Sequence, residues 1–302
     1  MELKFKQINN STSNFVTWLK GFKEIQPSLL LEVDLVEKEF VAKCFPPEKS
    51  IVKYSRISFE DAGYELMFIN DNDGNEITNW QETHGNAFPS ANRVKVGIYN
   101  ILSKFIDVFA TFSESEHTMS IKFDVSNNVR YIQDSKNVYT EYQAEQITLH
   151  SISLTMNIRC SVISEYFYRC DDDTFMKIVC FIKESVVFEL SSETISNLIK
   201  ISSVFTIDKS RDSIKFYSKQ AENGNWALYA YDETNNAYDY LLGYYLEGNA
   251  CETSTVIFRE NFLNATKGLN GNIKITLDTQ NSSRMLIDSG SSKIVVAAVQ
   301  NR

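Results

Sequence analysis

Cysteine and histidine are the residue types of this chain best suited to metal binding or catalysis. The cysteines are Cys44, Cys160, Cys170, Cys180 and Cys251. Five is an odd number and no two cysteines form a CxxC pair, so free thiols in a reducing compartment explain them sufficiently. The ten-residue spacing of the central three is too wide for a zinc knuckle.

The histidines and the acidic residues add no clear site. His84, His117 and His150 are isolated in sequence, and the adjacent carboxylates of 171–173 are typical of a solvated turn. The chain also lacks the phosphate-binding GxxxxGK[ST] and GxGxxG patterns, the GxSxG elbow and the HExxH zinc motif. We therefore expect a protein that is not an enzyme and that holds no metal or cofactor.

The composition is that of an ordinary globular protein. The 302 residues are 43% hydrophobic and carry 39 acidic against 30 basic side chains, a net charge of −9. A chain of this length most naturally forms two domains. No apolar run is long enough to span a membrane and the first residues lack the apolar core of a signal peptide, so the expected location is the cytoplasm.

Four amphipathic helices stand out against a sequence that otherwise alternates like strands. They are predicted at Thr12–Lys23, Gly97–Phe109, Ser192–Phe205 and Glu260–Leu269. Each follows a strand-like run and has an apolar stripe at helical spacing, and the expected N-caps are Asn10 or Ser11 for the first and Ser191 or Ser192 for the third. A single amphipathic helix cannot bury its face alone, so each must lie across a sheet.

Each predicted helix also carries an outward lysine near its end. These lysines are Lys20, Lys104, Lys200 and Lys267. One such lysine is ordinary for an exposed helix, but a fourfold repetition favours a common surface that faces a polyanion.

Two segments carry a resemblance to a known family. They are VKVGIYNILSKFIDVF (94–109) and the region from Val186, which begins VVFELSSETISNLIKISSVF and ends in the hairpin strands of NIKITLDTQNSSRMLIDSGSSKIVVAAVQ. Together with the strand and helix pattern of nearly the whole chain, these segments resemble the DNA sliding clamps of the PCNA and tailed-phage type, the polymerase processivity factors.

The resemblance implies an α+β DNA-clamp fold. Two similar domains, each of two strand-helix-sheet units, would place antiparallel sheets outside and four helices on the inner face. The predicted domains are 1–183 and 184–302. The N-terminal half is longer than the family pattern, which places insertions near 60–92 and 126–146.

The resemblance further implies a homotrimeric ring of phage or viral origin that encircles duplex DNA without sequence preference. The expected DNA-facing residues are Lys20, Lys23, Lys104, Lys200 and Lys267, with Lys209 and Arg211 as additions. The acidic balance of the chain disfavours DNA binding by the outer surface, whereas a basic lining would contact phosphates loosely.

The implied partners are a DNA polymerase and a clamp loader, which clamps bind through short peptide motifs. The expected peptide pocket contains Phe181, Val187, Ala298 and Val299, although each of them taken singly is better explained as a strand core residue. Subunits would join by pairing unlike edge strands, with residues 237–246 as the candidate edge of the C-terminal domain.

Two alternatives remain open on the sequence. The first is a clamp-fold viral processivity factor that works as a monomer or dimer and holds DNA by charge. The second is a non-enzymatic all-β virion or carbohydrate-binding protein that uses the 15 tyrosines and 20 phenylalanines for assembly or stacking.

Overall fold

The structure is a computed structural model that divides the chain into two compact units. The N-terminal unit comprises Met1–Cys44 and Arg56–Asp172, and the C-terminal unit comprises Phe45–Ser55 and Asp173–Arg302. The residues described are 1–9, 11–46, 50–80, 93–132, 135–163, 175, 177–178, 185–205, 212–280 and 283–299, without the side chains of 126–132 and 135–140. A single boundary after residue 183 stays a prediction, and the short segment 45–55 groups with the later part of the chain.

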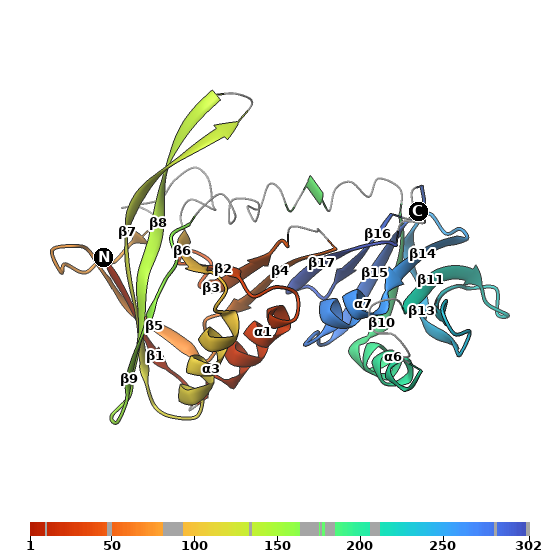
Figure 1. Cartoon of the computed structure of the whole chain (residues 1–302), viewed down its shortest axis with the longest axis horizontal. Coiled ribbons are helices and arrows are strands. Elements are labelled where there is room, and N and C mark those ends of the chain that lie inside the picture. Colours follow the sequence, from red (N-terminus) through yellow and green to blue (C-terminus); the bar gives the residue numbers. More distant parts are fainter. Residues whose placement is uncertain are drawn as a thin grey trace. The chain divides into compact units, whose positions relative to one another are not determined.

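The N-terminal unit combines the helices α1 and α3 with strands (Figure 1). Its elements are β1 (Glu2–Gln7), α1 (Ser13–Lys23), β2 (Leu29–Asp34), β3 (Glu39–Cys44), β4 (Ile51–Ser58), β5 (Tyr64–Asn70), β6 (Arg93–Ile98), α3 (Leu102–Phe112), β7 (Thr118–Ile132), β8 (Ser135–His150) and β9 (Thr155–Arg159). The first residues of β4 belong to the C-terminal unit.

The C-terminal unit repeats this order. Its elements are β10 (Ser185–Ser191), α6 (Ser192–Val204), β11 (Ser213–Gln220), β12 (Trp226–Asp232), β13 (Asp239–Gly248), β14 (Thr253–Phe258), α7 (Arg259–Thr266), β15 (Asn272–Asp278), β16 (Arg284–Asp288) and β17 (Ser292–Ala297). Each half of it is therefore a strand, a helix and three strands, as the sequence predicted.

The two units share one pattern of strand pairing. In the N-terminal unit, β1 pairs with β5 and β7, and β2 pairs with β3 and β6. In the C-terminal unit, β10 pairs with β13 and β15, and β11 pairs with β12 and β14. In each unit, the first two strands of the first repeat pair with strands of the second repeat. These pairs are β1 with β7 and β2 with β6 in the N-terminal unit, and β10 with β15 and β11 with β14 in the C-terminal unit. The repeats of a unit are thus interlocked through backbone hydrogen bonds.

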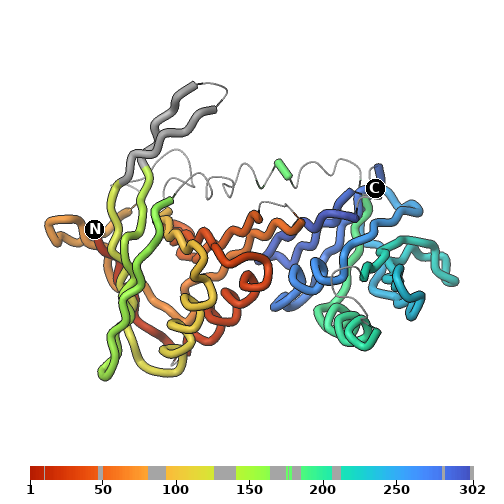
Figure 2. Tube along the Cα trace, in the orientation of Figure 1, coloured from red at the N-terminus to blue at the C-terminus, as the bar shows by residue number. Residues whose placement is uncertain are grey.

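The C-terminal unit also takes in a strand from the earlier part of the chain. The first residues of β4 run antiparallel to β17, from Ser55 opposite Ser292 to Ile51 opposite Val296. Figure 2 shows this orange segment beside the dark blue one. The hydroxyls of Ser55 and Ser292 lie 2.6 Å apart and are buried. This edge of the sheet is therefore closed by a second segment of the same chain.

One crossing in the C-terminal unit requires glycine. Strand β13 pairs with β12 over its first half and with β10 over its second half. At Gly243, where it passes from one partner to the other, a Cβ atom would lie 2.2 Å from the carbonyl oxygen of Glu189. No side chain can be accommodated at this position without a backbone shift.

The helices of the N-terminal unit bury their apolar stripes in one aromatic core. Helix α1 contributes Phe15, Leu19 and Phe22, at the spacing of one helical face. Helix α3 lies beside α1 (Figure 1), and the rings of Phe15 and Phe109 are 5.2 Å apart in an edge-on arrangement. Beneath them, Phe5 of β1 contacts Phe59 at 5.1 Å. Burial of these rings holds the helices on the sheet.

The helices of the C-terminal unit, α6 and α7, also pack together. Helix α6 buries Ile195, Leu198 and Ser202. The helical spacing of the sequence predicts these three and Ile199 as its buried stripe. Helix α7 buries Phe262, whose ring lies 4.9 Å from that of Phe216 on β11. Its stripe is completed by Ala265 and Thr266, whereas the predicted Leu269 lies beyond the helix and is half-buried.

The predicted start of the second helix is wrong. Gly97 and Ile98 belong to strand β6, and α3 begins at Leu102 and continues to Phe112. The β6 residues pair with β2 as far as Ile98, so Gly97 and Ile98 are held in the sheet and the helix begins after them. Lys104 therefore lies in the first turn of its helix and not near its end.

Only one of the two predicted N-caps is confirmed. The Ser191 hydroxyl accepts a hydrogen bond from the Thr194 N–H of α6. The N-cap of α1 is Thr12, without a side-chain capping bond, in place of Asn10 or Ser11. Asn10 itself lies outside the described residues.

The two stretches expected as insertions contain regular strands. Residues 64–70 form β5, which pairs with β1 along its whole length, while 81–92 lie outside the described residues. Strands β7 and β8 form one long antiparallel hairpin with a register shift between Lys122 and Phe123. The described residues of the stretch 126–146 thus belong to this hairpin.

Truncation of the aromatic contact between α1 and α3 tests the packing of the N-terminal unit. Phe109→Ala should lower the free energy of unfolding by about 3–5 kcal/mol, because it removes a buried ring and leaves a cavity. Urea unfolding followed by circular dichroism measures the loss. The neighbouring exposed substitution Ala110→Ser serves as control and should change stability by less than about 0.5 kcal/mol. Equal stabilities of the two variants would contradict the described packing.

Candidate functional site

The candidate polyanion-facing residues of α1 lie on its solvent side. Lys20 and Lys23 are exposed, and neither belongs to the buried residues of the helix. Both belong to the last turn, where a cation is also stabilised by the helix dipole. Helix stability alone therefore accounts for lysine at these two positions. A role for them in binding must be argued from the lysines of the other helices.

The lysines of the other helices are exposed as well. Lys104 lies in the first turn of α3, Lys200 in the middle of α6 and Lys267 at the C-cap of α7. The helix dipole disfavours a cation in the first turn, so helix stability does not explain Lys104. Lys209 and Arg211, the two weaker predictions, lie outside the described residues.

The solvent faces of the four helices carry a small positive excess. Counted with their C-caps, they expose the five lysines already named. Against these stand four exposed carboxylates, those of Glu24, Asp107, Glu193 and Glu260. The difference is +1, whereas the whole chain is at −9. The helices are thus the less acidic part of the surface, but they are not strongly basic.

The arginine of α7 forms a buried ion pair. Arg259 is 1% exposed, and its guanidinium lies 3.0 Å from a carboxylate oxygen of Asp212 and 3.7 Å from one of Asp232. Although it belongs to a helix of the candidate surface, Arg259 faces the sheet. It holds the helix in place and is not available to a ligand.

A second buried network lies across β2, β3 and β6 of the N-terminal unit. Arg93 contacts Asp34 at 2.7 Å and Glu32 at 3.1 Å, and Glu32 also contacts Lys43 at 2.8 Å. All four side chains are less than a tenth exposed. These cations are neutralised inside the fold, which leaves the helix lysines as basic residues open to solvent.

Strand β9 offers an unpaired edge. Among the described residues it pairs on one side only, with β8. The Cys160 N–H donates to Glu145 (2.9 Å) and the Ser151 N–H donates to Leu154 (2.8 Å). Because bonded pairs alternate in an antiparallel ladder, the N–H groups of Thr155, Asn157 and Arg159 point away from β8.

Half of strand β13 is an edge of the same kind. The part of the chain that the structure describes has no strand beside residues 239–242 on the side opposite β12. The Asp232 N–H donates to Tyr238 (3.1 Å), so the same alternation directs the N–H groups of Asp239 and Leu241 outward. This half lies within the stretch 237–246 expected at a subunit contact, while its second half is covered by β10.

The predicted peptide pocket is only partly described. Phe181 lies outside the described residues. Val187 is 9% exposed and sits within β10, between β13 and β15. Ala298 and Val299 are half-buried, and their N–H groups donate to Ser283 and Val256 at 2.9 and 2.8 Å. Their role in binding a peptide stays a prediction.

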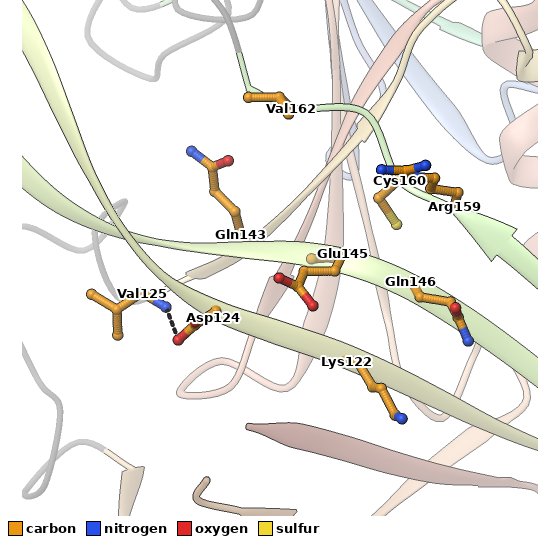
Figure 3. A pocket seen from close by; sticks show the side chains of 10 residues that line it. Lys122, Asp124, Val125, Gln143, Glu145, Gln146, Arg159, Cys160 and Val162 are labelled. Atoms are coloured by element: carbon orange, nitrogen blue, oxygen red, sulfur yellow. Dashed lines mark hydrogen bonds between the residues drawn. The ribbon is translucent and has the colours of Figure 1, made fainter.

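A concavity of about 860 Å³ lies over β7, β8 and β9 (Figure 3). Its charged lining consists of Lys122, Asp124, Glu145 and Arg159. Two cations and two anions cancel, so the concavity does not select a ligand of one charge. Cys160 also lines it, and burial raises the pKa of this thiol to about 12. A thiol of such high pKa is a poor nucleophile at neutral pH.

The remaining titratable groups form no catalytic arrangement in the described part of the chain. His117 lies between the hydroxyl of Tyr64, at 3.0 Å, and the carbonyl of Ser115, at 2.7 Å. Burial lowers the pKa of His117, and the pair is enclosed in the core. The described residues contain no group of three or more His, Cys, Asp or Glu side chains that could hold a metal ion.

Comparison by sequence finds no family model that matches the chain and no match among curated proteins. Within the described residues, no helix is both long and apolar enough to cross a membrane. The relationship of the chain to known proteins therefore rests on its three-dimensional structure.

Comparison by structure finds DNA clamps. The chain is similar to a subunit of the PCNA2–PCNA3 complex of Sulfolobus tokodaii, with a TM-score of 0.58, 15% identity and 99% of each chain covered. It is equally similar to A. fulgidus PCNA bound to the C-terminal region of FEN-1, with a TM-score of 0.58, 8% identity and 99% of each chain covered.

The bacterial clamp is also similar. The match to the DNA polymerase III beta chain of Streptococcus pneumoniae has a TM-score of 0.55 and 13% identity, and it covers 99% of this chain and 66% of the other. The chain therefore has the DNA-clamp fold, as the sequence predicted. Within that fold it resembles the PCNA-type clamps over their whole length.

The raised pKa of Cys160 gives a test of the concavity over β7, β8 and β9. With the pKa raised from 9.0 to about 12, the thiolate fraction at pH 8 falls about a thousandfold, and alkylation by iodoacetamide should slow accordingly. Peptide mass spectrometry of the native and the urea-unfolded chain measures the two rates. Similar rates at Cys160 in both states would show that this thiol is not buried.

Proposed function

We propose that the protein is a DNA polymerase sliding clamp, a non-enzymatic ring that encircles duplex DNA and tethers the replicative polymerase. The observation that carries the proposal is the fourfold strand-helix-sheet repeat, in which each of the four described helices carries an exposed lysine, in the helix or at its C-cap. The clamp fold of the chain supports it. Such a protein would work wherever the DNA is copied, in the cytoplasm or nucleoid.

The charge of the helices favours encirclement over binding by charge. A protein that holds DNA electrostatically must neutralise many phosphates at once, and its affinity then falls steeply with salt. A helix surface with an excess of only +1 supplies little of that attraction. A closed ring needs no such attraction, because encirclement alone keeps it on the DNA. The lysines then contact the phosphates only briefly.

The chain itself contains a pairing that would close such a ring. The β16–β17 hairpin and the β8–β9 hairpin are closed by backbone hydrogen bonds of the same spacing, from the N–H of Ser289 to Ser292 (2.9 Å) and from the N–H of Ser151 to Leu154 (2.8 Å). Strand β17 bonds to β4. Among the described residues, its counterpart β9 pairs on one side only, and half of β13, the third strand of the other repeat, pairs only with β12.

We therefore expect β9 of one copy to pair with residues 239–242 of the next. The two edges are unlike, so the contact is head to tail and can close a ring when the rotation between copies allows it. Three copies are expected, as in the resemblance on which the proposal was first based. The similarity to a subunit of a PCNA2–PCNA3 complex is in keeping with self-association.

The partners expected of such a ring are a DNA polymerase and a clamp loader, bound through short peptide motifs. The similar A. fulgidus PCNA is bound to the C-terminal region of FEN-1. Val187, Ala298 and Val299 stay candidates for the corresponding pocket, together with Phe181. Substitution of Val299 by a charged residue, followed by a polymerase-binding assay, would test this part.

The two alternatives from the sequence are less well supported. The repeat topology and the clamp fold argue against an all-β virion or carbohydrate-binding protein. The small helix charge argues against a monomeric or dimeric factor that holds DNA by charge.

Reversal of the helix lysines tests the proposed DNA-facing surface. The combined variant Lys20→Glu, Lys104→Glu, Lys200→Glu and Lys267→Glu should reduce clamp-dependent stimulation of DNA synthesis at least tenfold, because repulsion from the phosphates opposes loading and sliding. The matched control reverses Lys6, Lys122, Lys215 and Lys274, which lie on strands, and should retain stimulation. Equal stimulation by both variants would exclude the helices as the DNA-facing surface.

A proline on β9 tests the closure of the ring. Asn157→Pro removes an outward N–H without removing a bond to β8, so the mass in solution should fall from about three times 34.6 kDa to that of one copy. Light scattering after gel filtration measures it. Asn157→Ala keeps the N–H and should keep the assembly, and Leu241→Pro should act like Asn157→Pro from the other edge. A Pro variant that still assembles would rule out this edge.

A further inference from the structure

The N-terminal unit has a turn where the C-terminal unit has none. Strand β13 runs without a break from Asp239 to Gly248, and its second half pairs with β10. Its counterpart in the N-terminal unit is divided into β4 and β5, of which β5 pairs with β1. The residues 59–63 between them are an addition to the shared repeat, and they need an explanation beyond the fold.

The added turn is held firmly by backbone hydrogen bonds. The Ala62 N–H donates to Ser58 at 3.0 Å and the Tyr64 N–H donates to Phe59 at 2.8 Å. Gly63 has a φ of 83°, and a Cβ there would lie 2.2 Å from the carbonyl oxygen of Ser11, so only glycine fits. The Phe59 N–H bonds to Lys38, which ties the turn to the loop between β2 and β3. The turn therefore has one fixed shape.

This turn forms one wall of a pocket of about 550 Å³. The floor is apolar and consists of Ile8, Phe59, Leu66 and the buried Tyr64. Ile8 and Leu66 are only partly buried, so apolar surface remains open at the floor. Because the walls are fixed in advance, a ligand would bind without the entropic cost of ordering them.

The rim of the pocket is acidic. Glu37, Glu60 and Glu65 are exposed along it, and Lys38 is its one described cation. Glu65 contacts Lys6 at 2.7 Å, a pair in which both side chains are about half exposed and which contributes little. These carboxylates are not among any group that could hold a metal ion in the described chain. A net charge of −2 on the rim repels nucleic acid and attracts cations.

We propose that this pocket binds a short segment of a partner protein that carries an apolar side chain flanked by lysine or arginine. The apolar side chain would cover Leu66 and Ile8, and the flanking cations would lie against Glu37 and Glu60. Charge complementarity of this kind selects the partner and speeds its association. The pocket lies wholly within the N-terminal unit, so the proposal stands whether or not the protein forms a ring.

Fluorescein-labelled hexapeptide pools test the proposal by fluorescence anisotropy. In the first pool, apolar residues (Leu, Phe, Ile or Val) alternate with Lys or Arg. In the second pool, the same apolar residues alternate with Glu or Asp. The third pool is the first with Ser at every apolar position. The basic-apolar pool should bind at least tenfold more tightly than either of the others. Equal binding of the basic-apolar and acidic-apolar pools would overturn the proposal.

Two variants assign the binding to the pocket. Glu37→Lys with Glu60→Lys should weaken binding of the basic-apolar pool at least tenfold, whereas Glu222→Lys with Glu233→Lys makes the same charge change on exposed turns of the C-terminal unit and should not. Leu66→Ser should weaken binding without changing its salt dependence. Binding that is unchanged in the first variant would place the peptide elsewhere and refute the site. The mass in solution, measured on the same samples, reports separately on assembly.

Discussion

The structure depends on one constraint. The backbone N–H and C=O groups of the first strand in each unit form hydrogen bonds with strands of both repeats. Strand β1 is bonded to β5 of its own repeat and β7 of the next, and β10 is bonded in the same way to β13 and β15. A repeat taken alone would leave these groups without partners, at a cost of a few kcal/mol for each buried one. The helices can bury their apolar faces only on the sheet that results from this exchange, so their spacing on the surface follows from the pairing.

Much of this arrangement could be predicted because helices and strands leave different periods in a sequence. The apolar spacing of Phe15, Leu19 and Phe22 predicted α1 closely, and the alternation of the remaining chain predicted a sheet-rich fold. The prediction failed where tertiary pairing decides, as at Gly97 and Ile98, which continue β6 although their sequence suits a helix. The exchange of strands between repeats and the pocket beside residues 59–63 join parts of the chain that are distant in sequence, and no local pattern contains them.

The charged residues show the same limit. In sequence, Arg93 and Arg259 cannot be distinguished from the helix lysines, yet both are buried against carboxylates. What separates them is burial by other elements, which only the fold supplies. The candidate surface is therefore defined both by the lysines that the fold leaves exposed and by the arginines that it buries. Its small net charge also means that contacts with phosphates would be weak and easily exchanged.

The close approach at Gly243 has a consequence for tracing the ancestry of such chains. Exposed lysines can move from one helical position to a neighbouring one and still face the same ligand, so they leave little trace in a sequence after long divergence. A position where a second backbone leaves no room for a Cβ atom cannot move in this way. Distant relatives of this chain should therefore be easier to find by a glycine midway along the third strand after the helix than by any of their charges.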